Sequence, residues 1–458
     1  MPTVSENIAK WLQATSYNNI PQEVVDVAKR SIMDFIGVIL AGSRQPVAQI
    51  VKKYVNEVNG KQQATVIGLG IKVSCAEAAF ANGLLGHYLD YDDLLVPMPG
   101  MEGIHITAPI LPAALAIGEK ENKSGKEVIE AYILGCEITC KVGAGVDPSH
   151  SSLGWHPTAT KGIFGATVAA GRLLGLNEEE MSYALGVAGS EAAGLRENFG
   201  TMTKSFHVGH AAADGVRTAM LAKLGFNSSK TIFEGKDGFC RVLSKAPKID
   251  EITKNIGQPF CLPQVRLKLY PSCGNTHPAI EAMLNLVNRH NLHDISTENI
   301  EEIELKCDPT NILVERLEKP STGLMGKFSL PFCLALALSE GEVTVSQFTD
   351  EKVKEPKIVA LMEKVKIVPT PELRPTGDTA RPHIVEITLK GGKKIVSERV
   401  DFPRGSIENP IPDEELFQKY RSCASGVLQE KEIEKSIELI TNLEKVDDIG
   451  TLLDILTG

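Results

Sequence analysis

The sequence has no apolar run approaching the length of a membrane-spanning helix, and residues 1–20 lack the basic-then-apolar order of a secretory signal peptide. Its nine cysteines form no C-x-x-C pair and no regular spacing, so we expect small buried thiols in a reducing compartment. The net charge of -10 argues against a general nucleic-acid or anionic-membrane surface. These absences favour a cytoplasmic protein that binds neither nucleic acid nor a membrane.

Signatures of nucleotide and metal sites are also missing. The sequence contains no Walker loop, no G-x-G-x-x-G in a strand–turn–helix setting and no G-x-S-x-G nucleophile motif. His207-x-x-His210 is compatible with half of a metal site, but no third-ligand pattern and no H-E-x-x-H accompany it. Cys273 lies in a polar turn, and no motif around it indicates a thiol nucleophile. The sequence therefore predicts neither a metal nor another cofactor.

What the sequence does contain, up to about residue 260, is one helix pattern after another. A length of 458 residues suggests about two domains. Ser74 with Glu77, and Ser124 with Glu127, are capping boxes ahead of helices. Small residues dominate three further predicted helices, which implies that they pack closely against their neighbours. These helices are expected at about 159–174, 178–188 and 208–224.

The pattern changes near residue 262. Strands are predicted at 264–270 and 300–307, and Lys390-Gly391-Gly392 predicts a hairpin between strands 383–389 and 394–399. Helices are predicted between these strands, at about 278–289, 330–338 and 356–365. This middle part therefore reads as an α+β domain, and the helical chain after Pro412 could return to pack on the first helices.

Acidic and histidine side chains that could carry chemistry lie near predicted helix ends. Asp90-Tyr91-Asp92-Asp93 follows a helix, where a carboxylate can serve as a general base or orient a histidine. His105 and His156 each lie shortly before a helix, where exposed backbone N–H groups favour an anion. The alternatives are a solvated acidic turn and structural histidines.

Basic side chains gather in two further segments. Lys204 and His207 lie at the start of an alanine-rich helix, and Lys268, Tyr270 and His277 lie between a strand and a helix. An acidic protein can bind an anion only by concentrating its cations locally, and a cleft between domains would do so. The alternative is that both segments are ordinary polar connections.

In their order and spacing, these motifs resemble the MmgE/PrpD family over about residues 5–400. The resemblance rests on five stretches, namely 90–93, 105–114, 154–158, 204–211 and 268–278. The family comprises 2-methylcitrate dehydratases of propionate metabolism, cis-aconitate decarboxylases and iminodisuccinate epimerases.

The resemblance implies a mainly α fold with an α+β insert. A multihelical domain would be built from both chain ends, residues 1–262 and 400–458, with a smaller α+β lid domain at 263–399 and the site in the cleft. It also implies a homodimer, a small polycarboxylate substrate and no iron–sulfur cluster.

Carried over by motif, the catalytic residues would be Asp93, His105, His156 and Lys204, and the substrate-binding residues would be Lys268, Tyr270, His277, His207 and Asp90. Several cations suit a substrate with two or three carboxylates. Proton removal beside a carboxylate needs a positioned base and donors for the developing charge. His105 and His156 are the candidate acid–base pair, with Asp93 orienting them or acting as the base.

Three functions remain open from the sequence. The first expectation is a lyase that dehydrates a citrate-like hydroxy acid, such as 2-methylcitrate. The same fold could instead serve an epimerase or a decarboxylase, and a non-catalytic carboxylate-binding protein is the third alternative. Leu94 and Leu95 follow Asp93 where the family often has polar residues, which leaves the identity of the polycarboxylate open.

Overall fold

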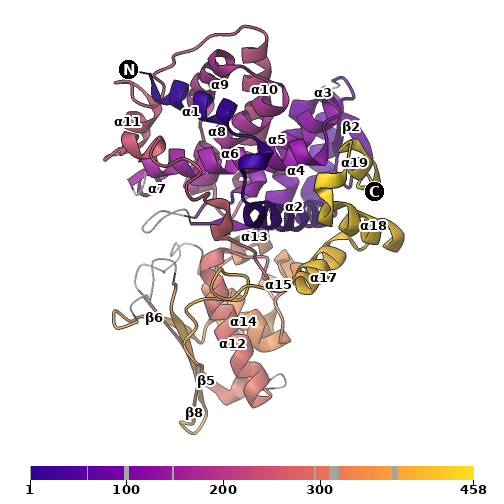
Figure 1. Cartoon of the computed structure of the whole chain (residues 1–458). Coiled ribbons are helices and arrows are strands. Elements are labelled where there is room, and N and C mark those ends of the chain that lie inside the picture. The colour runs from indigo at the N-terminus through magenta and orange to yellow at the C-terminus, as the bar shows by residue number, and fades with distance from the viewer. Residues whose placement is uncertain are drawn as a thin grey trace.

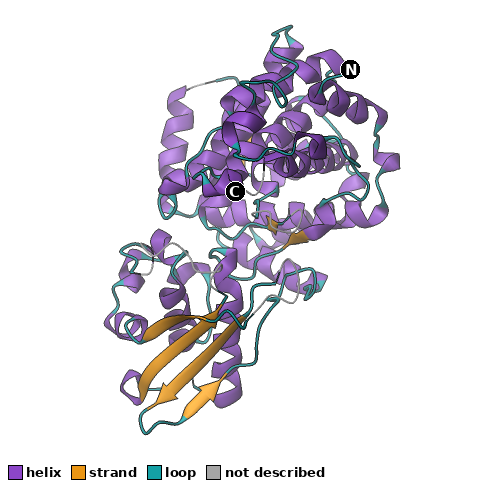
Figure 2. Cartoon of the chain, turned by 90° about the vertical axis from the view of Figure 1, so that its left-hand side faces the viewer, coloured by secondary structure: helices purple, strands orange, loops and turns teal. Residues whose placement is uncertain are grey.

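Most of the chain folds into helices, which pack above a smaller part that combines helices with a sheet (Figure 1, Figure 2). The predicted mainly α fold with an α+β insert is thus confirmed. The computed structural model describes residues 2–58, 60–96, 103–146, 149–292, 295–308, 317, 319–373 and 380–458. Within these ranges, no helix is both long and apolar enough to span a bilayer.

The larger, helical part begins at the N-terminus. Its elements up to residue 243 are α1 (Val4–Ala14), α2 (Gln22–Ser43), α3 (Pro46–Val58), β1 (Ala64–Val66), β2 (Ile71–Val73), α4 (Cys75–Tyr88), α5 (Thr107–Lys120), α6 (Gly125–Val146), α7 (Ser149–Ser152), α8 (Pro157–Leu173), α9 (Glu178–Glu191), α10 (Met202–Lys223) and α11 (Phe239–Leu243). The Ser124–Glu127 capping box is confirmed, since each residue's side chain accepts from the other's backbone N–H. Ser74 likewise accepts from the backbone N–H of Glu77.

Glycine lets α4 and α10 approach closely. A side chain at Gly83 would come within 3.1 Å of the Gly209 backbone, and one at Gly209 would come within 2.5 Å of the carbonyl oxygen of Phe80. This close approach brings the last turn of α4 beside the first turns of α10. The two helix ends carry His87 and Lys204, which meet in the site described below.

The C-terminal helices complete the same core as the N-terminal ones. Helices α17 (Asp413–Ala424), α18 (Glu430–Thr441) and α19 (Gly450–Ile455) follow the smaller part in sequence and pack on the N-terminal part (Figure 1). Tyr420 lies against Gly37 of α2, and one hydrophobic cluster combines residues from Ile20 to Leu267 with residues from Ile411 to Leu456.

The smaller part, for which we use the name lid (residues 277–396), has a separate core. Its sheet has the order β6-β5-β7-β8, in which β5 is parallel to β6 and antiparallel to β7. Its main helices lie on one side of this sheet (Figure 1). Ile303 and Leu305 of β5 are buried in one cluster with residues of these helices. The lid elements are α12 (His277–His290), β5 (Ile300–Cys307), α13 (Gly323–Gly326), α14 (Leu330–Glu340), α15 (Asp350–Val353), α16 (Pro356–Met362), β6 (Val365–Pro369), β7 (His383–Leu389) and β8 (Lys394–Val396).

Two predicted elements differ from the structure. The helix expected over 356–365 ends at Met362, because β-branched residues from Val365 onward pair with β5 instead. The strand expected over 264–270 is wrong except at β4 (Val265–Arg266), which pairs with β3 (Leu94–Leu95). The predicted hairpin is confirmed, although β8 ends at Val396 rather than Arg399.

Candidate active site

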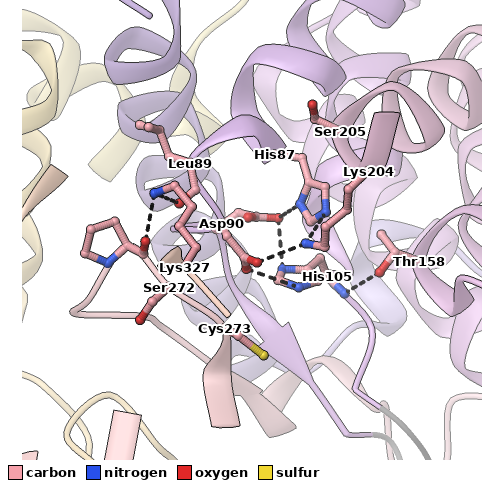
Figure 3. Close-up of polar contacts among 12 residues, drawn as sticks. His87, Leu89, Asp90, His105, Thr158, Lys204, Ser205, Ser272, Cys273 and Lys327 are labelled. Atoms are coloured by element: carbon pink, nitrogen blue, oxygen red, sulfur yellow. Dashed lines mark hydrogen bonds and ion pairs between the residues drawn. The ribbon is translucent and has the colours of Figure 1, made fainter. Parts of the chain in front are cut away.

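Buried charged side chains gather where the helical part meets the lid (Figure 3). They come from segments far apart in sequence: the end of α4 and the loop after it, the residues before α5, the first turn of α10, and residues 268–277 leading into α12. Because burial strengthens electrostatic interactions, each ion pair here has a larger effect than it would on the surface.

Asp90 is the centre of this group. Its φ of 51° places a non-glycine residue in the left-handed region, which aspartate tolerates better than most residues. Its carboxylate accepts from Lys204 Nζ at 3.1 Å and, in a closer contact, from Lys268 Nζ. His105 Nε2 lies 3.7 Å from Asp90 Oδ1. Burial by itself would raise the pKa of Asp90, but Lys204 and Lys268 outweigh it and hold the pKa well below its usual range.

A chain of hydrogen bonds runs from Asp92 to Lys204. His87 Nδ1 lies 2.8 Å from Asp92 Oδ2, and His87 Nε2 lies 2.9 Å from Lys204 Nζ. Because Lys204 can only donate, His87 Nε2 accepts and the His87 proton sits on Nδ1, facing Asp92. Burial lowers the pKa of His87 to about 4, so this imidazole is neutral at neutral pH.

Asp92 also faces His105. His105 Nδ1 lies 3.1 Å from Asp92 Oδ2, at an angle that makes no hydrogen bond. Asp92 Oδ1 is buried and has no hydrogen-bond partner within the described chain. Burial is the main cause that lowers the pKa of His105, with Asp92 opposing it. A neutral imidazole beside a carboxylate can accept a proton and then be stabilised as a cation.

His156 and His207 form a second pair next to the first. Their Nδ1 atoms lie 3.1 Å apart, so one ring donates to the other. The His156 ring stacks beside His87 with a centroid distance of 6.0 Å. Burial lowers the pKa of His207 to about 4 and that of His156 well below its usual value. The site therefore contains neutral imidazoles beside buried ammonium groups.

Three residues expected in the site make their described contacts with groups other than Asp90. Asp93 points to α5, where its carboxyl accepts from the backbone N–H and, in a close contact, the hydroxyl of Thr107. The rings of Tyr270 and His277 pack edge to face, with their centroids 5.1 Å apart. His277 Nε2 lies 3.3 Å from Ser272 O. Burial raises the pKa of Asp93 to about 8 and lowers that of His277 to about 3.

Four further residues belong to the site or support it, and none of them was among the predicted site residues. They are His87, Asp92, Lys327 and Lys419. Asp92 stood within a quoted motif, and the placement of His87 in the last turn of a helix before three carboxylates was the available signal. The two lysines had no local signal, because each lies alone in an unremarkable segment.

A hollow leads towards Asp90 from the seam between the two parts of the chain. Its narrow inner end, of about 10 Å³, is lined by His87, Asp90, Lys204 and Lys327, among others. A groove of about 690 Å³ shares Thr201 and Lys327 with it. Substrate could reach Lys204 through this groove, but the inner end must widen to admit a small polycarboxylate.

The arrangement suits an anion better than a metal ion. Ligand atoms of His87, Asp92 and His105 lie within 4.8 Å of one another, and two histidines with a carboxylate can hold a divalent metal. However, Lys204 is bonded to His87, and Lys268 is bonded to the neighbouring Asp90, so two ammonium groups would oppose a second cation. His207 and His210 do not converge either, since His210 pairs with Asp214 at 2.9 Å while His207 faces His156.

Comparison with known proteins gives matches along almost the whole chain. The family model of the MmgE/PrpD N-terminal domain matches residues 6–252, and that of the MmgE/PrpD C-terminal domain matches residues 270–445. A cis-aconitate decarboxylase of Aspergillus terreus is 29% identical, with 99% of this chain and 96% of that protein covered. Cis-aconitate decarboxylase of Homo sapiens is 26% identical, over 100% and 95% of the two chains. The mitochondrial 2-methylcitrate dehydratase of Yarrowia lipolytica is 24% identical, over 99% and 89%.

Proposed function

This chain belongs to the MmgE/PrpD family, and from that premise we propose that it is a lyase that decarboxylates a small unsaturated tricarboxylate of the cis-aconitate type. The observation that carries the proposal is the convergence of Lys204, Lys268 and His105 on one buried carboxylate, that of Asp90. A place that binds the protein's own carboxylate so closely can bind those of a substrate. The similarity to cis-aconitate decarboxylases favours loss of carbon dioxide over loss of water.

Lys204 and Lys268 would bind and orient the carboxylates. The described hydrogen bonds of Lys204 go to His87 and Asp90, which leaves one of its three N–H groups for a ligand. Charge-assisted hydrogen bonds to carboxylates are among the strongest in proteins. Exclusion of water would further favour conversion of a charged carboxylate into neutral carbon dioxide.

The reaction consumes one proton. The C–C bond to the leaving carboxylate breaks, and its electron pair forms a new C=C bond to the central carbon. The electrons of the original C=C bond then take a proton at its far carbon, which leaves a dicarboxylate and carbon dioxide. His105 is our candidate donor, because it faces both Asp90 and Asp92. Burial lowers its pKa, and a bound polyanion would raise that pKa and so charge the ring.

Dehydration of a 2-methylcitrate-like hydroxy acid is the second candidate. It is favoured by the neutral imidazoles, which can accept a proton from carbon, and by the similarity to 2-methylcitrate dehydratases. In that reaction, His105 or His156 would act first as a base and a second group would protonate the departing hydroxyl.

Product analysis distinguishes these functions. The protein is incubated separately with cis-aconitate, citrate and 2-methylcitrate in deuterated buffer, and products are identified by NMR. We expect cis-aconitate to give one carbon dioxide and a dicarboxylate with one deuterium on carbon. An unsaturated acid formed from 2-methylcitrate without carbon dioxide would instead identify a dehydratase. Binding of all three acids by calorimetry with no turnover would identify a carboxylate-binding protein.

A further inference from the structure

Two segments that carry the site, residues 89–91 and residues 268–271, contact each other through side chains: Lys268 Nζ donates to Asp90 O, and the Tyr91 hydroxyl donates to Leu269 O at 3.3 Å. They adjoin the antiparallel pairing of β3 with β4, in which Leu94 lies opposite Arg266 and Leu95 opposite Val265. No backbone hydrogen bond joins residues 89–91 to residues 268–271, all of which the structure describes. The buried carbonyls of these segments therefore need other donors.

Lys327 supplies donors to both of these segments. Its Nζ donates to Leu89 O and to Pro271 O, each at 2.8 Å, as Figure 3 shows. The side chain comes from the lid, just after α13, and is only 2% exposed. Its backbone carbonyl accepts from Cys273 N at 2.9 Å, which ties it to the same segment. Lys327 thus bridges a carbonyl of the helical part and a carbonyl of the chain entering the lid.

Lys419 supplies donors to the same two segments, at the carbonyls of Tyr91 and Lys268. Its Nζ donates to Tyr91 O at 2.9 Å and to Lys268 O at 2.8 Å. The side chain comes from α17, pairs with Asp34 of α2 at 2.7 Å, and lies 3.8 Å from the centre of the Tyr91 ring. The C-terminal helices therefore reach the site through one lysine.

Between these two lysines, Lys268 Nζ donates to Asp90 O at 2.9 Å. The three consecutive carbonyls of residues 89, 90 and 91 thus each accept from a different lysine side chain. Asp90 at their centre has the left-handed backbone that turns its carboxylate towards Lys204. Such a conformation persists only when the surrounding structure holds it.

We propose that Lys327 and Lys419 are positioning residues, which fix the backbone on both sides of Asp90 and thereby hold Lys204 and Lys268 in register with the substrate. Lys327 in addition makes this geometry depend on the lid, because its side chain leaves the site if the lid opens. The inference rests on the proposed lyase activity, in which Lys204 and Lys268 bind carboxylates.

The test replaces Lys327 with Met, which fills similar space and donates no hydrogen bond. Lys327 is the better target because its described hydrogen bonds go to carbonyls, whereas removing Lys419 would leave Asp34 buried without its partner. A displaced backbone should lower kcat by about 10- to 100-fold and change KM little, because misplacement acts on the chemical step. Lys354→Met is the matched control, since Lys354 is an exposed lysine of the lid.

Chemical rescue distinguishes positioning by Lys327 from a general contribution to folding, because only positioning predicts that a small added amine restores kcat. In Lys327→Ala, added ethylammonium should restore part of kcat by donating to the two carbonyls, while a neutral alcohol of the same size should not. If Lys327→Met does not fold, Lys327→Gln, which keeps two N–H donors on a shorter side chain, is tested in the same way.

Several outcomes would overturn the proposal. A folded Lys327→Met with kcat within about twofold of the wild type would show that the bridge is dispensable. A raised KM with unchanged kcat would show direct substrate binding by Lys327 instead. A crystal structure of the variant tests the inference without turnover: an unchanged left-handed Asp90 would refute it. Absence of turnover in the wild type, by contrast, would refute only the proposed function.

Discussion

Replacing Asp93 with Asn should remove a pH dependence of stability and leave activity almost intact. The Asp93 carboxyl is fully buried and bonded to Thr107, whose hydroxyl also lies 2.6 Å from the Tyr132 hydroxyl. Burial raises the pKa of Asp93 to about 8 despite the hydrogen bonds from Thr107 that lower it, so the group is protonated at neutral pH. An asparagine amide has the same shape, is neutral, and can donate to the Thr107 hydroxyl and accept from the Thr107 N–H.

The magnitude follows from proton linkage. In the unfolded chain the carboxyl ionises near 3.8, and in the folded chain near 8, so folding takes up a proton between these values. Stability from this group is complete below pH 4 and is lost as the pH rises towards 8. At about 1.4 kcal/mol per pH unit, the loss reaches at most about 6 kcal/mol. The asparagine variant has no such loss.

Urea unfolding of the wild type and of Asp93→Asn between about pH 5 and pH 8 measures this difference. As the pH rises, the free energy of unfolding of the variant should increase relative to that of the wild type by up to about 1.4 kcal/mol for each pH unit. The kcat of the variant should stay within about threefold of the wild-type value. Asp250→Asn, at an exposed position, should show no such trend. A stability difference that is independent of pH would refute the reasoning. Loss of turnover by about 100-fold or more in a folded variant would instead identify Asp93 as the base that the sequence suggested.

Three further predictions concern the cations, the histidines and the oligomeric state. Lys204→Met should lower kcat/KM by about 100-fold or more, because it removes a charge beside Asp90 and the donor to His87. As a control, Lys223→Met, on the exposed side of the same helix, should change kcat/KM by no more than about twofold. In an NMR titration, His87 should stay neutral down to about pH 5, since burial lowers its pKa to about 4. His210 should titrate above 6.5, because Asp214 raises its pKa. A charged His87 at pH 6 would contradict the assignment of its Nε2 as an acceptor from Lys204. Light scattering should give twice the chain mass of 49.5 kDa for the expected homodimer. Exposed aromatic patches mark interfaces, and the exposed rings of Tyr54 and Phe206 lie on either side of the half-buried Phe80 ring, so Phe206→Ser should weaken the dimer. An unchanged dimer would place the interface elsewhere.

Local signals in the sequence were enough for most of the helices and for the hairpin. Helix starts such as that at Ser124 are set by hydrogen bonds between residues three apart, and Lys390-Gly391-Gly392 permits the turn between β7 and β8 by itself. The motifs also named Lys204, Lys268, His105 and Asp90, which the structure brings together. Side chains within a recognisable local pattern can thus be proposed for the site before their contacts are known.

The strand β6 and the segment 267–270 were beyond such reasoning. Val365–Pro369 becomes a strand because β5, about 60 residues earlier, offers it a partner, and a short apolar run does not reveal that partner. Residues 267–270 have the composition of a strand, but side chains take the place of backbone donors there: Lys268 O accepts from Lys419 Nζ, and Leu269 O accepts from the Tyr91 hydroxyl.

The sequence by itself determined the helices, the class of fold and a list of candidate charges; only the tertiary structure decided which charges face one another. Asp90, Asp92 and Asp93 are equivalent acids in the sequence, and the left-handed backbone at Asp90 assigns them different partners. Lys327 and Lys419 resemble solvated lysines until the fold buries them against carbonyls more than 200 residues away. Burial and long-range pairing set the charge state and orientation of these groups, and the neighbouring residues in the sequence predict neither the burial nor the pairing.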